Sequence, residues 1–471
     1  MDNWIGKRVV IIGAARQGTA LARYLASRGA RVVLNDRRPT EALEAARLSL
    51  SAEGASIEWV CGGHPLELLD GTDLVCISGG VSPTLPLVVE AQKRGIPLSN
   101  DSQVFMQAVP CPVVGITGSA GKTTTTTLVG RMAHAAAARN AAMQSGDWPE
   151  RAWVGGNIGS PLIAFVDEMK TADVAVMELS SFQLELMTLS PQTAAVLNVT
   201  PNHLDRHASM GEYAAAKRRI LDFQNPGDTA VLGRDDPGAW AMAPAVRGRL
   251  VSFGFSEPLA GQEGAFLKDG AIYLRTGREE MRVMPRAEIR LRGEHNVLNV
   301  MAACAIASAA GLPVEAMHSG VEGFTGVPHR LEYVRKWKGA AWYNDSIATA
   351  PERAMAAIRS FDEPLVLLAG GRDKNLPWEE FAELALRRVD HVILFGEAAP
   401  KIEQALNQAR QPVSQTTLTR CAGLKEAVLA AANVVEEGDV VLLSPGGTSF
   451  DEFRDFEDRG EAFRKWVMEL L

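Results

Sequence analysis

The stretch "VVGITGSAGKTTTTTL" restricts the fold of this chain more than any other part of the sequence. It has the pattern of a short apolar strand, a glycine-rich turn and the first turns of a helix. This succession presents backbone N–H groups and a helix N-terminus to an anion, which is how a P-loop holds the phosphates of a nucleotide. Because such a strand needs parallel neighbours and crossover helices, the stretch predicts an α/β domain around it.

The residues of this turn have separate predicted roles. Lys122 adds a point charge beside the phosphates, and the hydroxyl of Thr123 or Thr124 can reach a Mg²⁺ ion. The spacing departs from the standard motif, since Ile116 stands where that spacing has glycine. The stretch therefore predicts a variant P-loop, whose nucleotide-binding residues are Gly118, Ser119, Gly121, Lys122, Thr123 and Thr124.

Apolar runs alternate with amphipathic segments on both sides of this loop. Examples are "RVVIIG" and "DLVCISGG" before it, and "EPLVLLAGG" and "DVVLLSPGG" near the end of the chain. Between them lies a β-rich region in which Asp269-Gly270 indicates a hairpin turn. At 471 residues the chain has room for about three domains. We predict an α/β fold of three domains in series: a Rossmann-like domain at 1–111, a central P-loop ATPase domain with a β-rich extension at 112–326, and a C-terminal α/β domain at 327–471.

Composition excludes several classes of partner. The net charge is −8, and no long basic cluster occurs, so we expect no nucleic-acid binding. No apolar run is long enough to span a bilayer. The five cysteines are scattered singly, without the spacing of a zinc site or disulfide framework, and the start lacks a signal-peptide pattern. We therefore expect a cytoplasmic protein that acts on small molecules, as a monomer and without a membrane.

Carboxylates for a metal are predicted at a strand end. The segment "ADVAVMELSSFQLE" places Glu178 at the carboxyl end of a predicted buried strand, where parallel α/β folds build their sites. After a later strand, "NVTPNHLDRH" gathers side chains that can hold metal or phosphate, although ordinary loop capping explains them equally well. The clustered side chains there are those of His203, Asp205, Arg206 and His207.

Lys217 has the pattern of a surface residue. It lies in the helical segment "EYAAAKRRIL" and is followed by Arg218 and Arg219. A lysine in a run of cations on a helix is typical of a solvated face.

The N-terminal turn "VVIIGAARQGTALARYL" has part of a dinucleotide fingerprint. Gly13 and Gly18 are kept, but the middle glycine is Ala15, and Asp36 ends the next strand, where an acid would contact a ribose. The missing glycine disfavours a nicotinamide-dependent dehydrogenase. A site for a nucleotide diphosphate and a purely structural turn remain open.

The last third of the chain presents polar residues after its apolar runs. The segments "VPHRLE", "WYNDSIATAPE" and "GGRDKN" contribute candidates, and glycine pairs in "LLAGGRDK" and "LLSPGGTSFDEF" expose backbone donors for an anion. Loop polarity explains each segment alone, but together they indicate a binding face. Its side chains include His329, Arg330, Asp345, Ser346, Thr349, Asp373 and Lys374.

Taken in order, these motifs together with "GGNIG", "AAKRRI" and "GEHNVLN" resemble the Mur ligase family over nearly the whole chain. The resemblance is greatest to its glutamate-adding members. It implies an ATP-dependent ligase of cell-wall peptidoglycan synthesis that phosphorylates the alanyl carboxylate of UDP-N-acetylmuramoyl-alanine. The amine of glutamate, expected to be the D form, then attacks the acyl phosphate to give an amide.

The resemblance also implies the roles of individual residues. Lys122, His203 and Lys217 would be catalytic, and Lys217 would carry a carbamate. Two Mg²⁺ ions would be held by Thr123, Glu178, His203 and the modified Lys217. ATP would contact Asn296, Arg330 and Asp345 in addition to the P-loop. The UDP substrate and glutamate would be bound by Arg16, Gln17, Asp36, Arg37, Ser78, Gly80, Asn157, Thr349, Lys374, Ser449 and Phe456.

Three departures from the family pattern leave alternatives open. Ala120 replaces an asparagine that is common in the loop, Ile347 stands where many relatives have lysine, and residues 133 to 153 form a longer segment than usual. Ile347 removes a cation near the acceptor, so L-glutamate or another amino acid stays an alternative substrate. A P-loop NTPase that acts as a switch is a more remote alternative.

Overall fold

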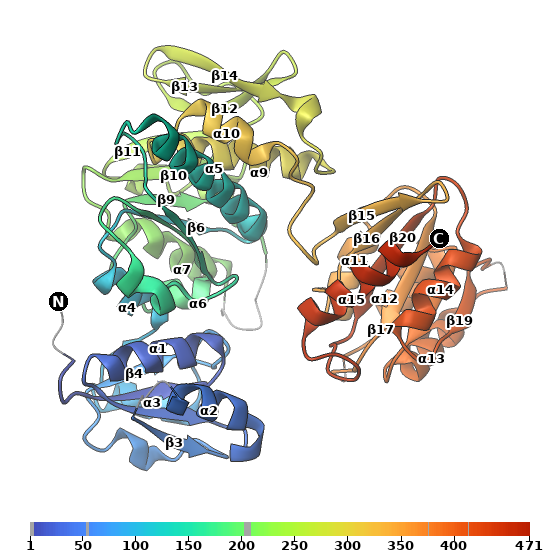
Figure 1. Cartoon of the computed structure of the whole chain (residues 1–471), viewed down its shortest axis with the longest axis horizontal. Helices are drawn as coiled ribbons and strands as arrows, with labels where there is room; N and C mark the ends of the chain where they lie inside the picture. The colour runs from blue at the N-terminus through green and yellow to red at the C-terminus, as the bar shows by residue number, and fades with distance from the viewer. Residues whose placement is uncertain (1–3, 53–55, 202–208, 375, 413) are drawn as a thin grey trace. The chain divides into compact units, whose positions relative to one another are not determined.

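The computed structural model describes residues 4–52, 56–201, 209–374, 376–412 and 414–471. The chain divides into two compact units, Met1–Phe324 and Thr325–Leu471. The described residues form three separate β-sheets, of five, nine and six strands, and helices cover each sheet (Figure 1). The predicted fold class, three α/β domains in series, is therefore confirmed. The exact domain boundaries at 111/112 and 326/327 stay a prediction.

The N-terminal sheet is parallel, with strand order β3-β2-β1-β4-β5. Its central strands are apolar runs buried on both faces, as expected where helices cover both sides. Gly18 allows the first helix to pack on the end of the first strand, because a Cβ there would lie 1.8 Å from the carbonyl oxygen of Gly13. The strands are β1 Arg8–Ile12, β2 Arg31–Asp36, β3 Ile57–Cys61, β4 Leu74–Ile77 and β5 Leu98–Ser99; the helices are α1 Arg16–Ser27, η1 Thr40–Leu43, α2 Glu44–Ala52, η2 Leu66–Leu69, α3 Pro86–Lys93 and α4 Asp101–Ala108.

The central sheet has the order β14-β13-β12-β11-β10-β9-β6-β8-β7 and is parallel from β7 to β12. Its strands are β6 Val113–Thr117, β7 Ala152–Gly156, β8 Val174–Glu178, β9 Thr193–Val196, β10 Thr229–Gly233, β11 Arg249–Gly254, β12 Glu263–Lys268, β13 Ala271–Thr276 and β14 Glu279–Pro285. The last two pairings are antiparallel and form the predicted β-rich extension. The predicted hairpin turn is also confirmed, since Asp269 and Gly270 have φ of 49° and 70° between paired strand ends.

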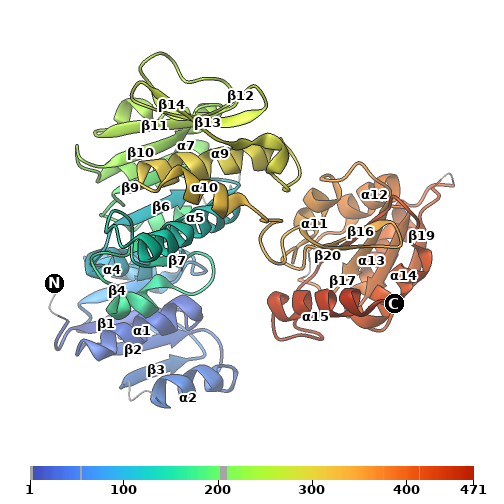
Figure 2. The same cartoon turned by 45° about the horizontal axis from the view of Figure 1, so that its top comes forward.

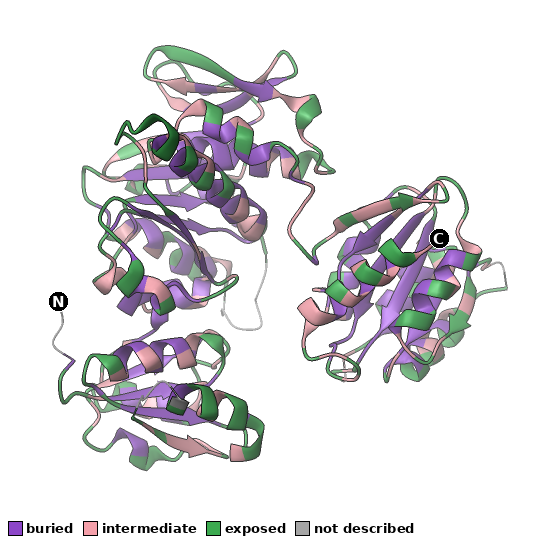
Figure 3. Ribbon diagram, in the orientation of Figure 1, coloured by how far each residue is buried: buried purple, intermediate pink, exposed green. Residues whose placement is uncertain are grey.

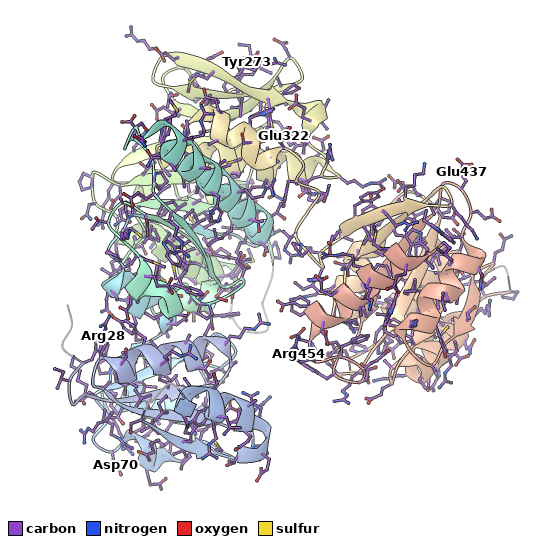
Figure 4. All side chains as sticks on the ribbon, viewed as in Figure 1. Arg28, Asp70, Tyr273, Glu322, Glu437 and Arg454 are labelled. Atoms are coloured by element: carbon purple, nitrogen blue, oxygen red, sulfur yellow. The ribbon has the colours of Figure 1, made fainter. Side chains whose placement is uncertain are left out.

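Helices cover this sheet on both faces. The long helix that follows the P-loop packs against the two last helices of the unit, as Figure 2 shows. The helices are α5 Lys122–Met143, η3 Leu162–Glu168, α6 Ser181–Leu184, α7 Met210–Asp222, α8 Pro237–Trp240, η4 Ala243–Ala245, η5 Arg286–Glu288, α9 Glu294–Ala309 and α10 Val314–Val321. Within the same unit, Arg28 at the end of α1 pairs with Asp167 of η3; Arg28 is labelled in Figure 4.

The C-terminal sheet has the order β15-β16-β20-β17-β18-β19, in which β15 alone is antiparallel to its neighbour. Its strands are β15 Glu332–Trp337, β16 Ala340–Asn344, β17 Leu365–Gly370, β18 His391–Phe395, β19 Thr417–Arg420 and β20 Val440–Gly446; its helices are α11 Pro351–Ile358, α12 Glu379–Arg388, α13 Ala399–Ala409, α14 Leu424–Val434 and α15 Phe456–Glu469. Helices α11 to α13 pack on one face, and α14 and α15 on the other. Figure 3 shows the buried strands between helices whose outer faces are exposed. The carboxyl ends of β16, β20 and β17 lie side by side, where parallel sheets place their ligands.

A buried arginine ties the loops at this edge together. Arg459 on α15 is 0% exposed. Its guanidinium donates to the hydroxyl and the carbonyl of Ser346, at 3.0 and 2.9 Å, and to the carbonyl of Gly447 from two nitrogens, each at 3.1 Å. Burial lowers the pKa of Arg459 to about 10. The loop after β16 is therefore held against the loop after β20.

In the part of the chain that the structure describes, no helix combines the length and apolar character needed to cross a bilayer.

Candidate active site

The P-loop forms at the carboxyl end of β6, as predicted. β6 ends at Thr117, whose hydroxyl donates to the carbonyl of Leu179 at 2.8 Å, and α5 begins at Lys122. Gly121 caps the helix with a φ of 81°, and a Cβ there would lie 2.2 Å from the side-chain oxygen of Asn299. Glycine is needed at this position for both reasons. The strand, turn and helix that bind phosphates are thus in place.

Two neighbours fix the shape of the loop. Asn198, just after β9, accepts from the N–H of Ala120 at 2.8 Å and donates to its carbonyl at 3.1 Å. The Ser119 hydroxyl donates to the carbonyl of Thr200 and accepts from its N–H, both at 2.9 Å. The sequence-based predictions did not include Asn198, although its position directly after the apolar run "TAAVL" indicates a polar side chain at a strand end. A loop held in this way keeps its N–H groups in position before any phosphate binds.

Two lysines meet at one carbonyl oxygen of the loop. The ammonium of Lys122 donates to Gly118 at 2.8 Å, and that of Lys217 donates to the same oxygen at 2.9 Å. The Lys217 ammonium also lies 4.5 Å from the ring centroid of Tyr213. Burial lowers the pKa of Lys217 to about 7, and the charge of Lys122 acts in the same direction. Lys217 is thus an amine that loses its proton near neutral pH.

The prediction that Lys217 is a surface residue is wrong. It is 1% exposed and points into the central domain from α7. The two arginines beside it point elsewhere: Arg218 pairs with Asp222 at 3.2 Å, and Arg219 donates to the carbonyl of Leu184 at 3.0 Å. Because successive helix positions differ by about 100°, a run of cations can have one member on the buried side. The sequence pattern did not say which.

Glu178 ends β8, beside the P-loop strand, as predicted. It is 1% exposed and pairs in register with Ile116 of β6. Its Oε1 accepts from the side-chain N–H of Asn157 at 2.9 Å, whereas its buried Oε2 has no hydrogen-bond partner among the described residues. A buried carboxylate oxygen without a protein partner fits a ligand to a hard cation such as Mg²⁺.

The two remaining predicted metal ligands are His203 and Thr123. His203 lies outside the described residues, together with Asp205, Arg206 and His207. Among the residues that are described, no group of three or more His, Cys, Asp or Glu side chains is arranged to hold a metal by itself. Thr123 lies in the first turn of α5, the position from which a P-loop threonine can reach the metal ion.

The predicted nucleotide residues of the first domain gather at the carboxyl edge of its sheet. Asp36 accepts from the N–H of Ala14 at 2.8 Å and from the guanidinium of Arg38 at 3.0 and 2.9 Å. Burial would raise the pKa of Asp36, but these hydrogen bonds outweigh it and hold that pKa well below its usual range. The carboxylate therefore fixes the turn after β1. Arg16 and Gln17 begin α1 directly after the turn that follows β1, whereas Arg37 follows β2, and Ser78 and Gly80 follow β4.

In the C-terminal unit, the predicted residues follow the three strands that end side by side. Buried Asp345 accepts from the Ser444 hydroxyl at 2.8 Å, and burial raises its pKa to about 7. The ammonium of Lys374 lies 3.4 Å from the hydroxyl of Thr349, so these two predicted residues are brought together. Ser449 follows β20, and Phe456 begins α15 with its ring 6.2 Å from that of His329.

Asn296 belongs to the first unit. It lies in the first turn of α9 and donates to the carbonyl of Arg292 at 2.7 Å, while Asn299 donates to its side-chain oxygen at 3.0 Å. Asn299 in turn lies against Gly121 of the P-loop. Asn296 is therefore linked to the loop through one intervening side chain. That Asn296, Arg330 and Asp345 contact one ATP molecule stays a prediction.

The P-loop, with an acid at the end of the adjacent strand, lies in a domain that follows a Rossmann-like one and precedes a third α/β one along the chain. Three protein-family models match the chain, one after another along the sequence. They are a MurD-like N-terminal domain at residues 7–100, a Mur ligase middle domain at 116–307 and a Mur ligase glutamate ligase domain at 329–447. Together with the family matches, this arrangement assigns the chain to the ATP-dependent ligases that join an acid to an amino acid.

The chain belongs to the Mur ligase family. A UDP-N-acetylmuramoylalanine–D-glutamate ligase of Symbiobacterium thermophilum is 41% identical over 464 residues, which cover 98% of each chain. The enzyme of the same name from Pelotomaculum thermopropionicum is 39% identical and covers 100% of this chain and 99% of its own. The sequence prediction of the family is confirmed, and the family implies the use of ATP.

Solved structures agree on the fold. The UDP-N-acetylmuramate–alanine ligase of Thermotoga maritima matches with a TM-score of 0.56 at 19% identity, covering 98% of this chain and 99% of its own. A UDP-N-acetylmuramoyl-L-alanyl-D-glutamate–2,6-diaminopimelate ligase matches with a TM-score of 0.54 at 18% identity, covering 99% of this chain and 92% of its own. At these identities the likeness supports the architecture alone.

Proposed function

We propose that this chain joins D-glutamate to the alanyl carboxylate of UDP-N-acetylmuramoyl-L-alanine, with conversion of ATP to ADP and phosphate, in the synthesis of peptidoglycan precursors. The observation that carries the proposal is the full-length similarity to ligases named for D-glutamate, at 41% and 39% identity. The MurD-like match of the first domain supports the same assignment. The three substrates are small molecules, and we expect the enzyme to act on them as a monomer in the cytoplasm, where nucleotide-linked precursors are made.

The chemistry explains why a P-loop is needed for an amide bond. A carboxylate is a poor electrophile because it has no good leaving group. Transfer of the γ-phosphoryl group of ATP to a carboxylate oxygen forms an acyl phosphate and releases ADP. The amine of glutamate then attacks the acyl carbon, the tetrahedral adduct expels phosphate, and the nitrogen loses a proton as the amide forms. Lys122 and the N–H groups at the N-terminus of α5 stabilise the charge on the transferring group.

Glu178 is the proposed ligand of a Mg²⁺ ion, with Thr123 beside the phosphates. The support is the buried Oε2 atom that has no hydrogen-bond partner among the described residues, since Mg²⁺ takes oxygen ligands. When bound, the ion neutralises charge on the phosphates and orients them. Asn157 holds the other oxygen of Glu178 and so fixes the direction of the carboxylate. His203 is proposed, by motif alone, as a ligand of a second ion.

We propose that Lys217 carries a carbamate. Its amine is buried and loses its proton near neutral pH, and a neutral amine is the form that adds to CO₂. In that addition an N–C bond forms and the nitrogen releases one proton, so the side chain changes from a cation to a carboxylate-like anion. The adjacent ammonium of Lys122 would balance this new charge. If Lys217→Ala is inactive and small carboxylic acids fail to restore turnover, the carbamate is refuted.

The remaining ligands are proposed from motif and placement together. In the first domain, the support is that the residues proposed to bind uridine diphosphate lie at the carboxyl edge of the same sheet. In the C-terminal unit, the support is the contact between Lys374 and Thr349 and the burial of Ser449 on the loop after β20. Proposed for the UDP substrate are Arg16, Gln17, Asp36, Arg37, Ser78, Gly80 and Asn157; for ATP, Asn296, Arg330 and Asp345; and for glutamate, Thr349, Lys374, Ser449 and Phe456.

The deciding experiment offers the enzyme UDP-N-acetylmuramoyl-L-alanine, ATP and Mg²⁺ with D-glutamate or L-glutamate in separate reactions. Phosphate release and product mass are measured in each. We expect turnover and the mass of one added glutamate with the D form only. Turnover with L-glutamate only would show that the acceptor site has a different specificity, and turnover with neither would overturn the proposed reaction. A matched reaction without the UDP substrate detects phosphate release that is uncoupled from ligation, as an NTPase switch would show.

A further inference from the structure

Three cations lie at the carboxyl edge of the C-terminal sheet: Arg330, Arg353 and Lys374, here called the cation rim. Arg330 precedes β15, Arg353 is in the first turn of α11, and Lys374 follows β17. Partial desolvation lowers the pKa of Arg353, and Arg330 lowers it further. In the same way, desolvation lowers the pKa of Lys374, and the charge of Arg353 lowers it further. Arg353 therefore lies near both Arg330 and Lys374.

The cation rim has no counter-ion among the described residues. None of its three members forms an ion pair with any residue that the structure describes, whereas Arg372 beside it pairs with Glu397 at 2.9 Å. Asp373, the acid next to Lys374 in sequence, forms an ion pair with Lys401 at 2.6 Å. Asp345 and Glu352 raise the pKa of Arg353, and Glu352 also raises that of Lys374, but neither acid forms an ion pair with a member of the rim.

The charge of Asp345 is itself weakened. Burial raises the pKa of Asp345 to about 7, and its two oxygens accept from Ser444 at 2.8 Å and from the N–H of Leu331 at 3.2 Å. Like charges held together without a counter-ion repel one another and attract an anion. The rim therefore has the electrostatic character of an oxyanion site.

Arg353 is placed where this site meets the loop that carries Thr349. Its Nη1 lies 3.5 Å from the carbonyl oxygen of Ile347, and Lys374 lies 3.4 Å from the Thr349 hydroxyl. Ile347 gives this loop no cation of its own. The guanidinium of Arg353, which reaches the loop from the first turn of α11, supplies one. Its planar fork of donors matches the two oxygens of a carboxylate.

We propose that Arg353 binds one carboxylate of the incoming amino acid, beside Lys374 and Thr349, and so selects a dicarboxylate as the acceptor. This inference rests on the proposed function, because glutamate is the dicarboxylate of that reaction. With two carboxylates to hold, the site needs more than the single cation of Lys374, and Arg353 provides the second. A phosphate of ATP is also an oxyanion, and the KM values for D-glutamate and for ATP distinguish these two ligands.

The test compares four enzymes: wild type, Arg353→Gln, Arg353→Lys and the control Arg359→Gln. Gln removes the charge but keeps a polar side chain, Lys keeps the charge without the fork, and Arg359 is an exposed arginine at the other end of α11. The KM for D-glutamate, for ATP and for the UDP substrate is measured for each. Removal of a charge-assisted hydrogen bond weakens binding by about tenfold to a hundredfold.

We expect Arg353→Gln to raise the KM for D-glutamate by about that factor and to leave the other two KM values within about twofold. Arg353→Lys should recover part of the loss, and Arg359→Gln should match wild type. An unchanged KM for D-glutamate in Arg353→Gln overturns the proposal, and a rise in the KM for ATP instead assigns the rim to a phosphate. Failure of the wild type to use D-glutamate would refute the proposed function itself, which distinguishes the two failures.

Discussion

Replacing Lys217 by methionine is expected to stabilise the first unit while it abolishes ligation. The side chain is buried, and its pKa falls from 10.5 to about 7 on folding. At pH 7 the unfolded chain keeps the proton that the folded protein holds only half of the time. A shift of this size costs the folded state about 4 kcal/mol at pH 7. The methionine variant is free of this cost but loses the hydrogen bond to Gly118, worth about 1 kcal/mol, so the net gain is about 3 kcal/mol.

The pH dependence has a definite sign. Between pH 7 and 10.5 the unfolded state binds more protons than the folded state, so the stability of the wild type rises with pH across this window. The advantage of Lys217→Met should therefore shrink, from about 3 kcal/mol at pH 7 to about 1 kcal/mol at pH 9. Below pH 7 both states are protonated, and the advantage should stay near its maximum.

The assay is urea unfolding in bicarbonate-free buffer. The unfolding is monitored by hydrogen exchange of peptides from α7, because these peptides report on the first unit alone. Lys93→Met, at an exposed lysine on α3, is the matched control and should follow the wild type at every pH. If Lys217→Met is no more stable than wild type at pH 7, or if its advantage does not decline toward pH 9, the argument from burial of a charged amine is wrong.

Three further predictions concern the residues around the two sheet edges. Glu178→Gln keeps the hydrogen bond from Asn157 but removes the charge, so kcat/KM should fall by at least about a hundredfold with little change in melting temperature; an unchanged Mg²⁺ dependence of kcat/KM would contradict the metal assignment. Asn198→Ala removes both hydrogen bonds to Ala120, and the KM for ATP, measured by phosphate release, should rise by about tenfold while the KM for D-glutamate stays unchanged. Arg459→Met leaves two buried carbonyls unpaired and should destabilise the C-terminal unit by roughly 2 to 5 kcal/mol in thermal unfolding, whereas Arg454→Met, at an arginine that is exposed and labelled in Figure 4, should change stability by less than about 0.5 kcal/mol.

The local features of the site were predictable because each has a short-range cause. A strand, a glycine turn and a helix in succession can be seen in one short stretch of sequence, and β6, the loop and α5 form as that pattern predicts. The same holds for Glu178 at the end of β8 and for the Asp269-Gly270 hairpin. In each case the residue's neighbours in sequence supply the backbone conformation or the strand end.

Other features depend on residues that are distant in sequence, and these were not predictable. The burial of Lys217 depends on which side of α7 faces the P-loop, 99 residues earlier in the chain. Asn198 holds Ala120 from 78 residues away, and Arg459 holds Ser346 from 113 residues away. No local pattern distinguishes these side chains from solvated ones.

The sequence by itself therefore determined the class of fold, the phosphate-binding loop and the family, because these depend on periodicity and on runs of adjacent residues. Only the tertiary structure decided which charges are buried, which are paired and which stand together without a counter-ion. Burial and pairing set the pKa of Lys217 and leave Arg353 beside Lys374. The physical reason is that the energy of a charge depends on the groups and the solvent around it, and folding brings those groups together from remote parts of the chain.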